Sequence, residues 1–64
     1  MNKIPEIDSL CIQDYGWLNT GNGFDCTSIK FEIVGSETWY KCFNVNGEEF
    51  RNINGKFVIM IDYK

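Results

Sequence analysis

The sequence predicts a small all-β domain, built mainly as an antiparallel meander. Its 64 residues include five phenylalanines, three tyrosines and two tryptophans, and aromatic side chains favour strands. Alanine, the residue that favours helices most, is absent. Turn-forming pairs divide the second half at regular intervals: Gly35-Ser36, Asn46-Gly47 and Asn54-Gly55. These three observations indicate one domain of strand-length segments joined by short turns.

The first element, within residues 5–15, has two interpretations. As a strand, residues 10–12 pair into the sheet. As a helix, it begins near Pro5 and ends at Gly16, which makes the fold α+β. The helix interpretation rests on apolar residues spaced three or four positions apart: Ile4, Ile7, Cys11, Tyr15 and Leu18. After either element, the two glycines and two asparagines of residues 19–23 predict a loop.

Four strands of a meander then follow, separated by the turns: residues 27–34, 38–45, 48–53 and 56–63. The second and the fourth of these are apolar on both faces. We expect one face to form the core, with Trp39, Phe43, Val45, Phe57, Ile59 and Ile61. The opposite face requires a cover, either from the N-terminal segment or from another chain. Its residues are Tyr40, Cys42, Val58 and Met60.

The energy balance of the isolated chain favours support from another chain. From the scaling of surface with mass, apolar burial contributes about 100 kcal/mol, whereas ordering 64 residues costs about 96 kcal/mol. Cys11, Cys26 and Cys42 are odd in number and close no disulfide framework, although one disulfide with one free thiol remains an alternative. Without histidine or a C-x-x-C pair, we expect no metal and no other cofactor.

The chain lacks the usual catalytic groups. Without histidine, the commonest general acid–base residue and the Ser-His-Asp triad are both missing. Glu48 and Glu49 are neighbours on a strand and therefore point to opposite faces. Gly21-Asn22-Gly23 lacks the third glycine and the Gly-Lys-Ser or Gly-Lys-Thr of phosphate-binding loops. We therefore expect no catalytic residues and no enzyme.

Charge and hydropathy exclude two further classes. The net charge is −3 and the six basic residues stand singly, so nucleic acid is not the expected partner. The longest apolar run, residues 57–61, is too short to span a membrane. The first residues lack the apolar stretch of a signal peptide, so we expect a cytoplasmic location with reduced thiols.

The chain contains three short motifs, Trp39-Tyr40-Lys41-Cys42 with Asn46-Gly47, residues 11–15 and residues 53–58, that resemble those of SH3-like β-barrel domains. Trp39-Tyr40-Lys41-Cys42, followed by Asn46-Gly47, resembles the central hairpin of that family and its distal turn. Residues 11–15 are similar to its opening strand and Asp-Tyr corner, and residues 53–58 to its 3₁₀ turn and last strand. The resemblance implies a barrel. The proline-rich peptide site of the family is not matched, because its tyrosine, proline and asparagine are replaced here by Gln13, Asn54 and Lys56.

Together, these observations predict a non-enzymatic protein-interaction module. It either associates with itself, most simply as a homodimer, or binds a larger basic-surfaced protein as a small inhibitor or adaptor. The interface is expected at the uncovered apolar face and at two further aromatic side chains. Its residues are Tyr40, Val58, Met60, Tyr15 and Trp17.

The alternative function is binding of a small molecule, nucleotide-like or sugar-like, in an aromatic pocket at a subunit boundary. Trp17 and Trp39 would then stack on the ring of the ligand. The backbone amides of Gly21 and Gly23 would contact its phosphate.

Overall fold

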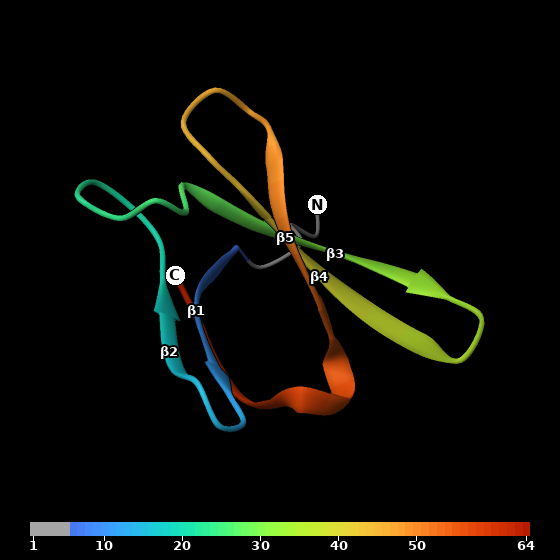
Figure 1. Ribbon diagram of the computed structural model, residues 1–64. Coiled ribbons are helices and arrows are strands. Elements are labelled where there is room, and N and C mark those ends of the chain that lie inside the picture. The colour runs from blue at the N-terminus through green and yellow to red at the C-terminus, as the bar shows by residue number, and fades with distance from the viewer. Residues whose placement is uncertain (1–5) are drawn as a thin grey trace, which may run out of the picture.

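The computed structural model describes residues 6–64 and contains six strands and one 3₁₀ turn (Figure 1). Their bounds are β1 Ile7–Ile12, β2 Gly16–Asn19, β3 Ser28–Val34, β4 Glu37–Phe43, β5 Glu49–Asn54, η1 Gly55–Phe57 and β6 Val58–Tyr63. The strands form two antiparallel sheets of order β2-β1-β6 and β3-β4-β5, named here the β1 sheet and the β4 sheet. The predicted all-β class is therefore confirmed.

The helix interpretation of residues 5–15 is wrong, because Ile7–Ile12 forms the central strand of the β1 sheet. Leu10 pairs with Leu18 on one side and with Ile61 on the other, so β1 is hydrogen-bonded along both edges. Tertiary pairing with β6, which lies about fifty residues away in the sequence, outweighs the local helical spacing of the apolar residues. Pro5 lies outside the described residues.

The predicted four-strand meander holds for β3, β4 and β5 but not for the last strand, because β6 pairs with β1 instead of β5. The Asn54-Gly55 pair is therefore not a hairpin turn. The Asn54 side-chain oxygen accepts a hydrogen bond from the Lys56 backbone N–H at 3.0 Å and caps η1. A Cβ at Gly55 would lie 2.9 Å from the Thr38 carbonyl oxygen, so this glycine permits close packing as the chain crosses between the sheets.

The two other predicted turns are confirmed as hairpins. Val34 pairs with Glu37 across Gly35-Ser36, and Gly35 has a φ of 64°, as the first central residue of a type II′ turn requires. At Asn46-Gly47, only the glycine has a positive φ, at 79°, so the connection is a three-residue loop with a left-handed glycine and not the type I′ turn typical of Asn-Gly pairs. The N–H of Gly47 donates to the Asn44 carbonyl at 2.9 Å and closes that loop.

The expected core face of β4 is inverted. Cys42 is fully buried and Tyr40 packs against the core, whereas Trp39 and Phe43 lie on the other face of the strand and Val45 is 83% exposed in the turn. The buried core consists of Ile7, Leu10, Ile12, Cys26, Ile29 and Cys42. The space between two such short sheets is narrow, and a cysteine fits its centre where a large ring does not.

The alternation expected on β6 also fails. Val58 and Ile61 pack against the core, but Phe57 and Ile59 are exposed. The pairing with β1 shifts register between Cys11 and Ile12, and such an irregularity changes which side chains face inward. A strict two-residue period therefore assigns the wrong faces at the start of this strand.

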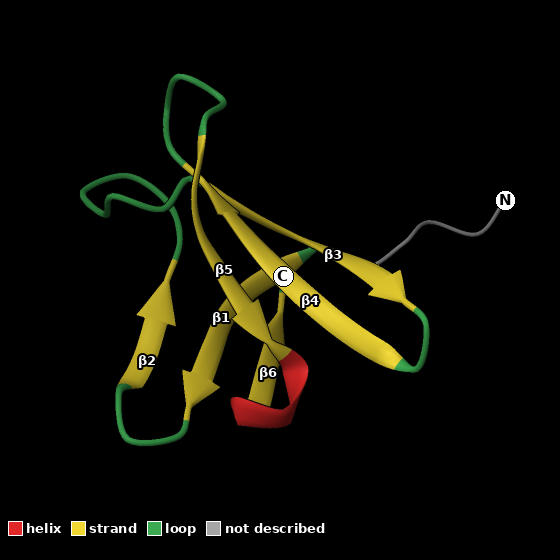
Figure 2. Cartoon of the chain, turned by 45° about the vertical axis from the view of Figure 1, so that its right-hand side comes forward, coloured by secondary structure: helices red, strands yellow, loops and turns green. Residues whose placement is uncertain are grey.

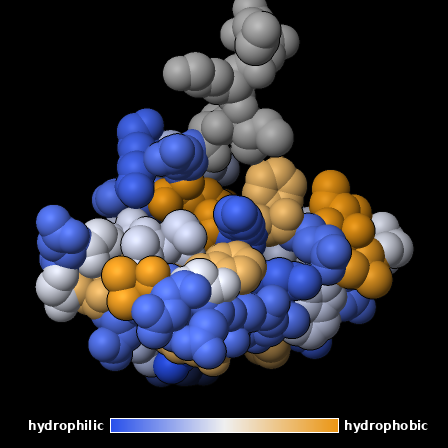
Figure 3. Space-filling view, turned by 90° about the horizontal axis from the view of Figure 1, so that it is seen from above, coloured by the Kyte–Doolittle hydropathy of each residue, from blue (hydrophilic) through white to orange (hydrophobic). Residues whose placement is uncertain are grey.

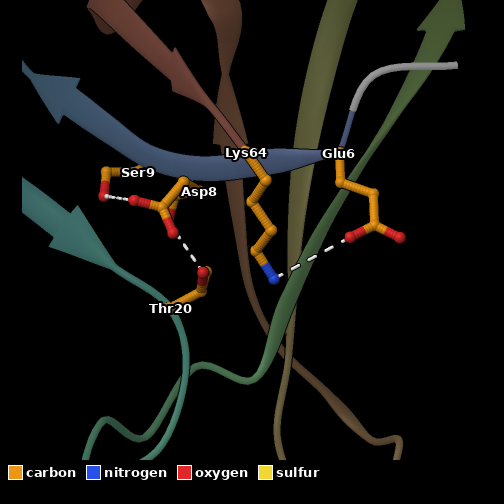
Figure 4. A network of polar contacts seen from close by, with 5 residues as sticks. All are labelled: Glu6, Asp8, Ser9, Thr20 and Lys64. Atoms are coloured by element: carbon orange, nitrogen blue, oxygen red, sulfur yellow. Dashed lines mark hydrogen bonds and ion pairs between the residues drawn. The ribbon is translucent and has the colours of Figure 1, made fainter.

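Polar contacts hold β1 in its place between β2 and the C-terminal residue (Figure 4). The Asp8 carbonyl accepts hydrogen bonds from the Thr20 N–H at 3.1 Å and from the Thr20 hydroxyl at 2.7 Å. At the other edge, the Lys64 N–H donates to the Glu6 carbonyl at 2.9 Å, and their side chains form an exposed ion pair at 3.9 Å. The Ser9 hydroxyl contacts the Asp8 carboxylate at 3.3 Å. These bonds fix the end of the strand at which the β2–β3 loop begins.

The left-handed conformation at Gly47 yields the first prediction. Gly47→Val should lower the free energy of unfolding by about 1–2 kcal/mol, because a β-branched residue is strained at this φ. Space is not the cause, since a Cβ there meets nothing within 4 Å. Urea unfolding measures the loss. Gly47→Asn is the matched control and should lose less, since asparagine tolerates this conformation, and equal losses in the two variants would contradict the explanation.

Candidate functional site

Four exposed aromatic side chains gather where the β1–β2 turn, the β2–β3 loop and the start of β5 meet. They are Tyr15, Trp17, Phe24 and Phe50, between 44% and 57% exposed. Together with Asp25 and Arg51 they border a concavity of about 220 Å³. Phe24, Asp25 and Phe50 also line a neighbouring hollow of about 380 Å³ that extends to the β4–β5 turn. This group of four rings is called the aromatic surface below.

Local backbone geometry presents two of these rings. Asp14 and Gly16 adopt positive φ values of 64° and 108° in the turn between β1 and β2. The Tyr15 N–H donates to the Ile12 carbonyl at 3.1 Å, which holds the tyrosine at the tip of the turn. Trp17 follows on β2 opposite Cys11. Because Leu18 faces the core, its neighbour Trp17 points to the outside of the β1 sheet.

The glycine-rich loop presents the third ring, and the backbone amides of Gly21 and Phe24 form hydrogen bonds within the loop. Gly21 and Gly23 have φ values of 117° and 91°, so the chain can turn back on itself. The Gly21 N–H donates to the Cys26 carbonyl at 3.1 Å, and the Phe24 N–H donates to the Gly21 carbonyl at 3.2 Å. The amide of Gly21 is therefore not free to bind a phosphate, contrary to the expectation for the small-molecule alternative. Figures 1 and 2 show this loop beside the β4–β5 turn.

Charged side chains of both signs lie at the aromatic surface. The guanidinium carbon of Arg51 lies 4.9 Å from the centroid of the Tyr15 ring. Asp25 lines the concavity, and Asp14 stands in the turn beside Tyr15. Residues 4–29 contain four acidic side chains and no basic one. At the surface itself, the Asp25 carboxylate and the Arg51 guanidinium border the concavity, and Asp14 belongs to the adjoining turn.

A row of apolar side chains crosses the outer face of the β1 sheet from the same tryptophan. Cys11 pairs with Trp17 on β2 and with Met60 on β6. Met60 is 56% exposed, and Cys11 is partly buried between its neighbours. Trp17 thus belongs both to this row and to the aromatic surface, so three of the predicted interface residues, Tyr15, Trp17 and Met60, lie on connected exposed surface.

The face that the sequence suggested for Tyr40, Val58 and Met60 does not exist. Tyr40 and Val58 pack against the core, each from a different sheet, whereas Met60 points outward. The Tyr40 ring lies 6.4 Å from that of Phe31, and burial, followed by the nearby charge of Tyr63, raises the pKa of its hydroxyl. The expectation failed because β4 turns its other face inward and because the alternation on β6 is broken at the start of that strand.

The expected pairing of the two tryptophans is also wrong. Trp39 lies on β4 opposite Glu32 and Asn54, and it is not among the residues that border the concavity at Trp17. Sequence reasoning also missed three members of the site: Phe24, Phe50 and Arg51. Phe24 had a usable signal, because a ring in a loop of glycine and asparagine has no strand that directs it into the core.

Within residues 6–64, no group of three Cys, Asp or Glu side chains is placed to hold a metal ion. Cys11, Cys26 and Cys42 are unpaired thiols. Burial, together with the neighbouring Cys26, raises the pKa of the Cys42 thiol to about 12. The Cys26 thiol donates a hydrogen bond to the Ser28 backbone carbonyl, with the sulfur and the oxygen 3.3 Å apart. A neutral, fully buried thiol is a poor nucleophile.

Comparisons with protein-family models, with curated proteins and with solved structures found no match for this chain. Within residues 6–64, no helix is long and apolar enough to cross a membrane. The function proposed below therefore rests on the surface, charges and thiols described here.

The Cys42 thiol yields a prediction about pH. Its pKa is raised from 9.0 in the unfolded chain to about 12 in the folded chain, so folding favours the protonated form. The contribution of the protonated Cys42 thiol to the free energy of unfolding is fully present below about pH 9 and is lost as the pH rises toward 12. Urea unfolding should show a loss of about 1 kcal/mol between about pH 8 and about pH 10.

The control for this prediction is Cys42→Ala. This variant loses packing at every pH, but its free energy of unfolding should fall less between the two pH values because it has no thiol to ionise. The same slope in both proteins would contradict the assignment. In addition, Cys42 should resist a thiol reagent at about pH 8 until denaturant is added.

Proposed function

We propose that the chain is a non-enzymatic protein-interaction module that binds a larger, basic-surfaced protein as a small inhibitor or adaptor. The observation that carries this proposal is the aromatic surface, where Tyr15, Trp17, Phe24 and Phe50 stand exposed around one concavity. Exposed apolar patches on small proteins mark binding sites, and tyrosine and tryptophan contribute most to binding energy at interfaces.

The charges support a basic partner. The carboxylate of Asp25, which borders the concavity, and that of the nearby Asp14 would face lysine or arginine side chains of the partner. Among residues 6–64, the cation that borders the concavity is Arg51, which already lies over the Tyr15 ring. A cationic partner would therefore gain attraction from the carboxylates and would meet ring faces that accept positive charge.

The order of elements supports the resemblance to SH3-like barrels. The β4–β5 hairpin turns at Asn46-Gly47, and the 3₁₀ turn at Gly55–Phe57 stands directly before the last strand. The aromatic surface includes none of Gln13, Asn54 and Lys56, the positions at which residues of the proline-rich peptide site of that family are replaced. We therefore propose a barrel of this kind with a different binding surface. Three free thiols support a reducing compartment, and we place the module in the cytoplasm.

A second candidate function is binding of a small molecule with a flat ring. The concavity of about 220 Å³ and the exposed Trp17 ring favour it, because a ligand ring would stack there. Of the four ligand residues expected from the sequence, Trp17 is the one that borders this concavity. A thermal-shift screen with nucleotides and sugars tests this candidate, since a ligand that binds the folded chain raises the melting temperature.

Two phenylalanines of equal exposure test the protein-binding proposal. Phe50 belongs to the aromatic surface and Phe57 lies on η1, and each is 45% exposed. Immobilised wild-type chain should capture a partner from extracts of its native cell, and Phe50→Ala should weaken the binding of that partner about tenfold or more. Phe57→Ala, the matched control, should bind as the wild type does.

The comparison separates binding from folding. Melting temperatures show whether either variant is destabilised, and Trp17→Ala repeats the test at a second position of the aromatic surface. Unchanged binding by both Phe50→Ala and Trp17→Ala would contradict the proposal. Equal weakening by Phe50→Ala and Phe57→Ala would place the binding surface elsewhere.

A further inference from the structure

We propose that two copies of this chain associate through antiparallel pairing of their β3 strands, with Phe31 of each copy opposite Phe31 of the other on a two-fold axis. Among the described strands, β3 pairs with β4 alone and is the edge of its sheet. Figures 1 and 2 show the β3–β4 hairpin projecting beyond the β1 sheet. This association does not depend on the aromatic surface, to which β3 contributes no residue.

The turn of the hairpin determines which backbone groups are free. Val34 and Glu37 flank a two-residue turn, and such flanking residues form a hydrogen-bonded pair. Hydrogen-bonded positions alternate along an antiparallel ladder, so the even-numbered residues of β3 bond to β4. Ile29, Phe31 and Ile33 then direct their N–H and C=O groups to the free edge. An exposed edge of this kind is a template for pairing with another chain.

The charges of β3 select one register for this pairing. Pairing centred on Phe31 keeps every side chain on its own face and sets Lys30 opposite Glu32 of the second copy, twice across the axis. Centring on Lys30 or on Glu32 would instead bring like charges face to face, which is unfavourable. The Lys30–Glu32 positions would be non-hydrogen-bonded pairs, in which opposing side chains lie closest.

The Lys30 ammonium has no carboxylate partner within residues 6–64 and could accept one from a second copy. Within its own sheet it lies opposite another cation, Lys41, whose ammonium forms ion pairs with Glu32 at 3.1 Å and with Glu49 at 3.8 Å. The Lys30 ammonium lies 5.5 Å from the Phe43 ring centroid and forms no ion pair within residues 6–64. Glu32 of a second copy would supply its carboxylate partner.

The apolar face of β3 fits the same register. Ile29 would lie opposite Ile33 of the second copy, and the two Phe31 rings would meet at the axis. Ile33 is 67% exposed, and Figure 3 shows hydrophobic side chains at the end of the hairpin. Next to Ile29 is a largely apolar concavity of about 490 Å³, bordered also by Ile7 and Phe31. Ile33 of the second copy would enter the mouth of this concavity and be removed from water.

Charge reversal tests the association and its register together. Sedimentation of the full chain at increasing concentration should show a reversible dimer. Lys30→Glu and Glu32→Lys should each weaken self-association about tenfold or more, because each creates two like-charge pairs. An equimolar mixture of the two variants should dimerise again, since every facing pair in the mixed dimer has opposite charges. Lys56→Glu, which makes the same change in net charge as Lys30→Glu but away from β3, should dimerise as the wild type does.

The equimolar mixture of the two variants distinguishes loss of charge pairing between copies from damage to the fold of either variant. Loss of the Glu32–Lys41 ion pair affects the Glu32→Lys chain alone, and mixing cannot repair it. Failure of the mixture to dimerise would overturn the register, and a wild-type chain that stays monomeric at millimolar concentration would overturn the association. A dimer that is lost in Phe50→Ala but retained in Lys30→Glu would place self-association at the aromatic surface instead.

Discussion

The narrow space between the two sheets is the constraint on which the rest of the structure depends. Its fully buried side chains are Leu10, Cys26 and Cys42. Because two short sheets enclose little volume, the centre accepts side chains of this size and the ten aromatic rings must lie at the rim or outside. The same burial that fills the core keeps the Cys42 thiol protonated and removes it as a nucleophile.

The exposure of these rings is therefore a consequence of the small core. Within residues 6–64, Trp17, Phe24 and Phe50 stay exposed, and the turns and loops between strands bring these rings together at one place. In the proposed function, the acidic side chains of residues 4–29 would favour a cationic partner. Binding of a partner would remove apolar surface from water that the isolated fold leaves exposed.

Free sheet edges also follow from the small size of the two sheets, because each sheet has three strands and therefore two edge strands. The edge of β3 extends past the β1 sheet, and its charges alternate with apolar residues along the strand. In the proposed two-fold pairing about Phe31, Lys30 of each copy lies opposite Glu32 of the other. A register centred on Lys30 or on Glu32 would instead place like charges opposite each other. Such charges on an edge select one partner geometry and disfavour others.

The sequence by itself determined the all-β class, the hairpins at Gly35-Ser36 and Asn46-Gly47, and the exposed aromatic residues Tyr15 and Trp17, because turn preferences and strand composition are local properties. Only the tertiary structure decided that β6 pairs with β1 and that β4 turns Cys42 inward. Both depend on contacts between segments far apart in the sequence, and β4 is apolar enough on either face to be turned both ways. The meeting of Tyr15, Trp17, Phe24 and Phe50 arises for the same reason, since no spacing in the sequence brings β2 next to the start of β5.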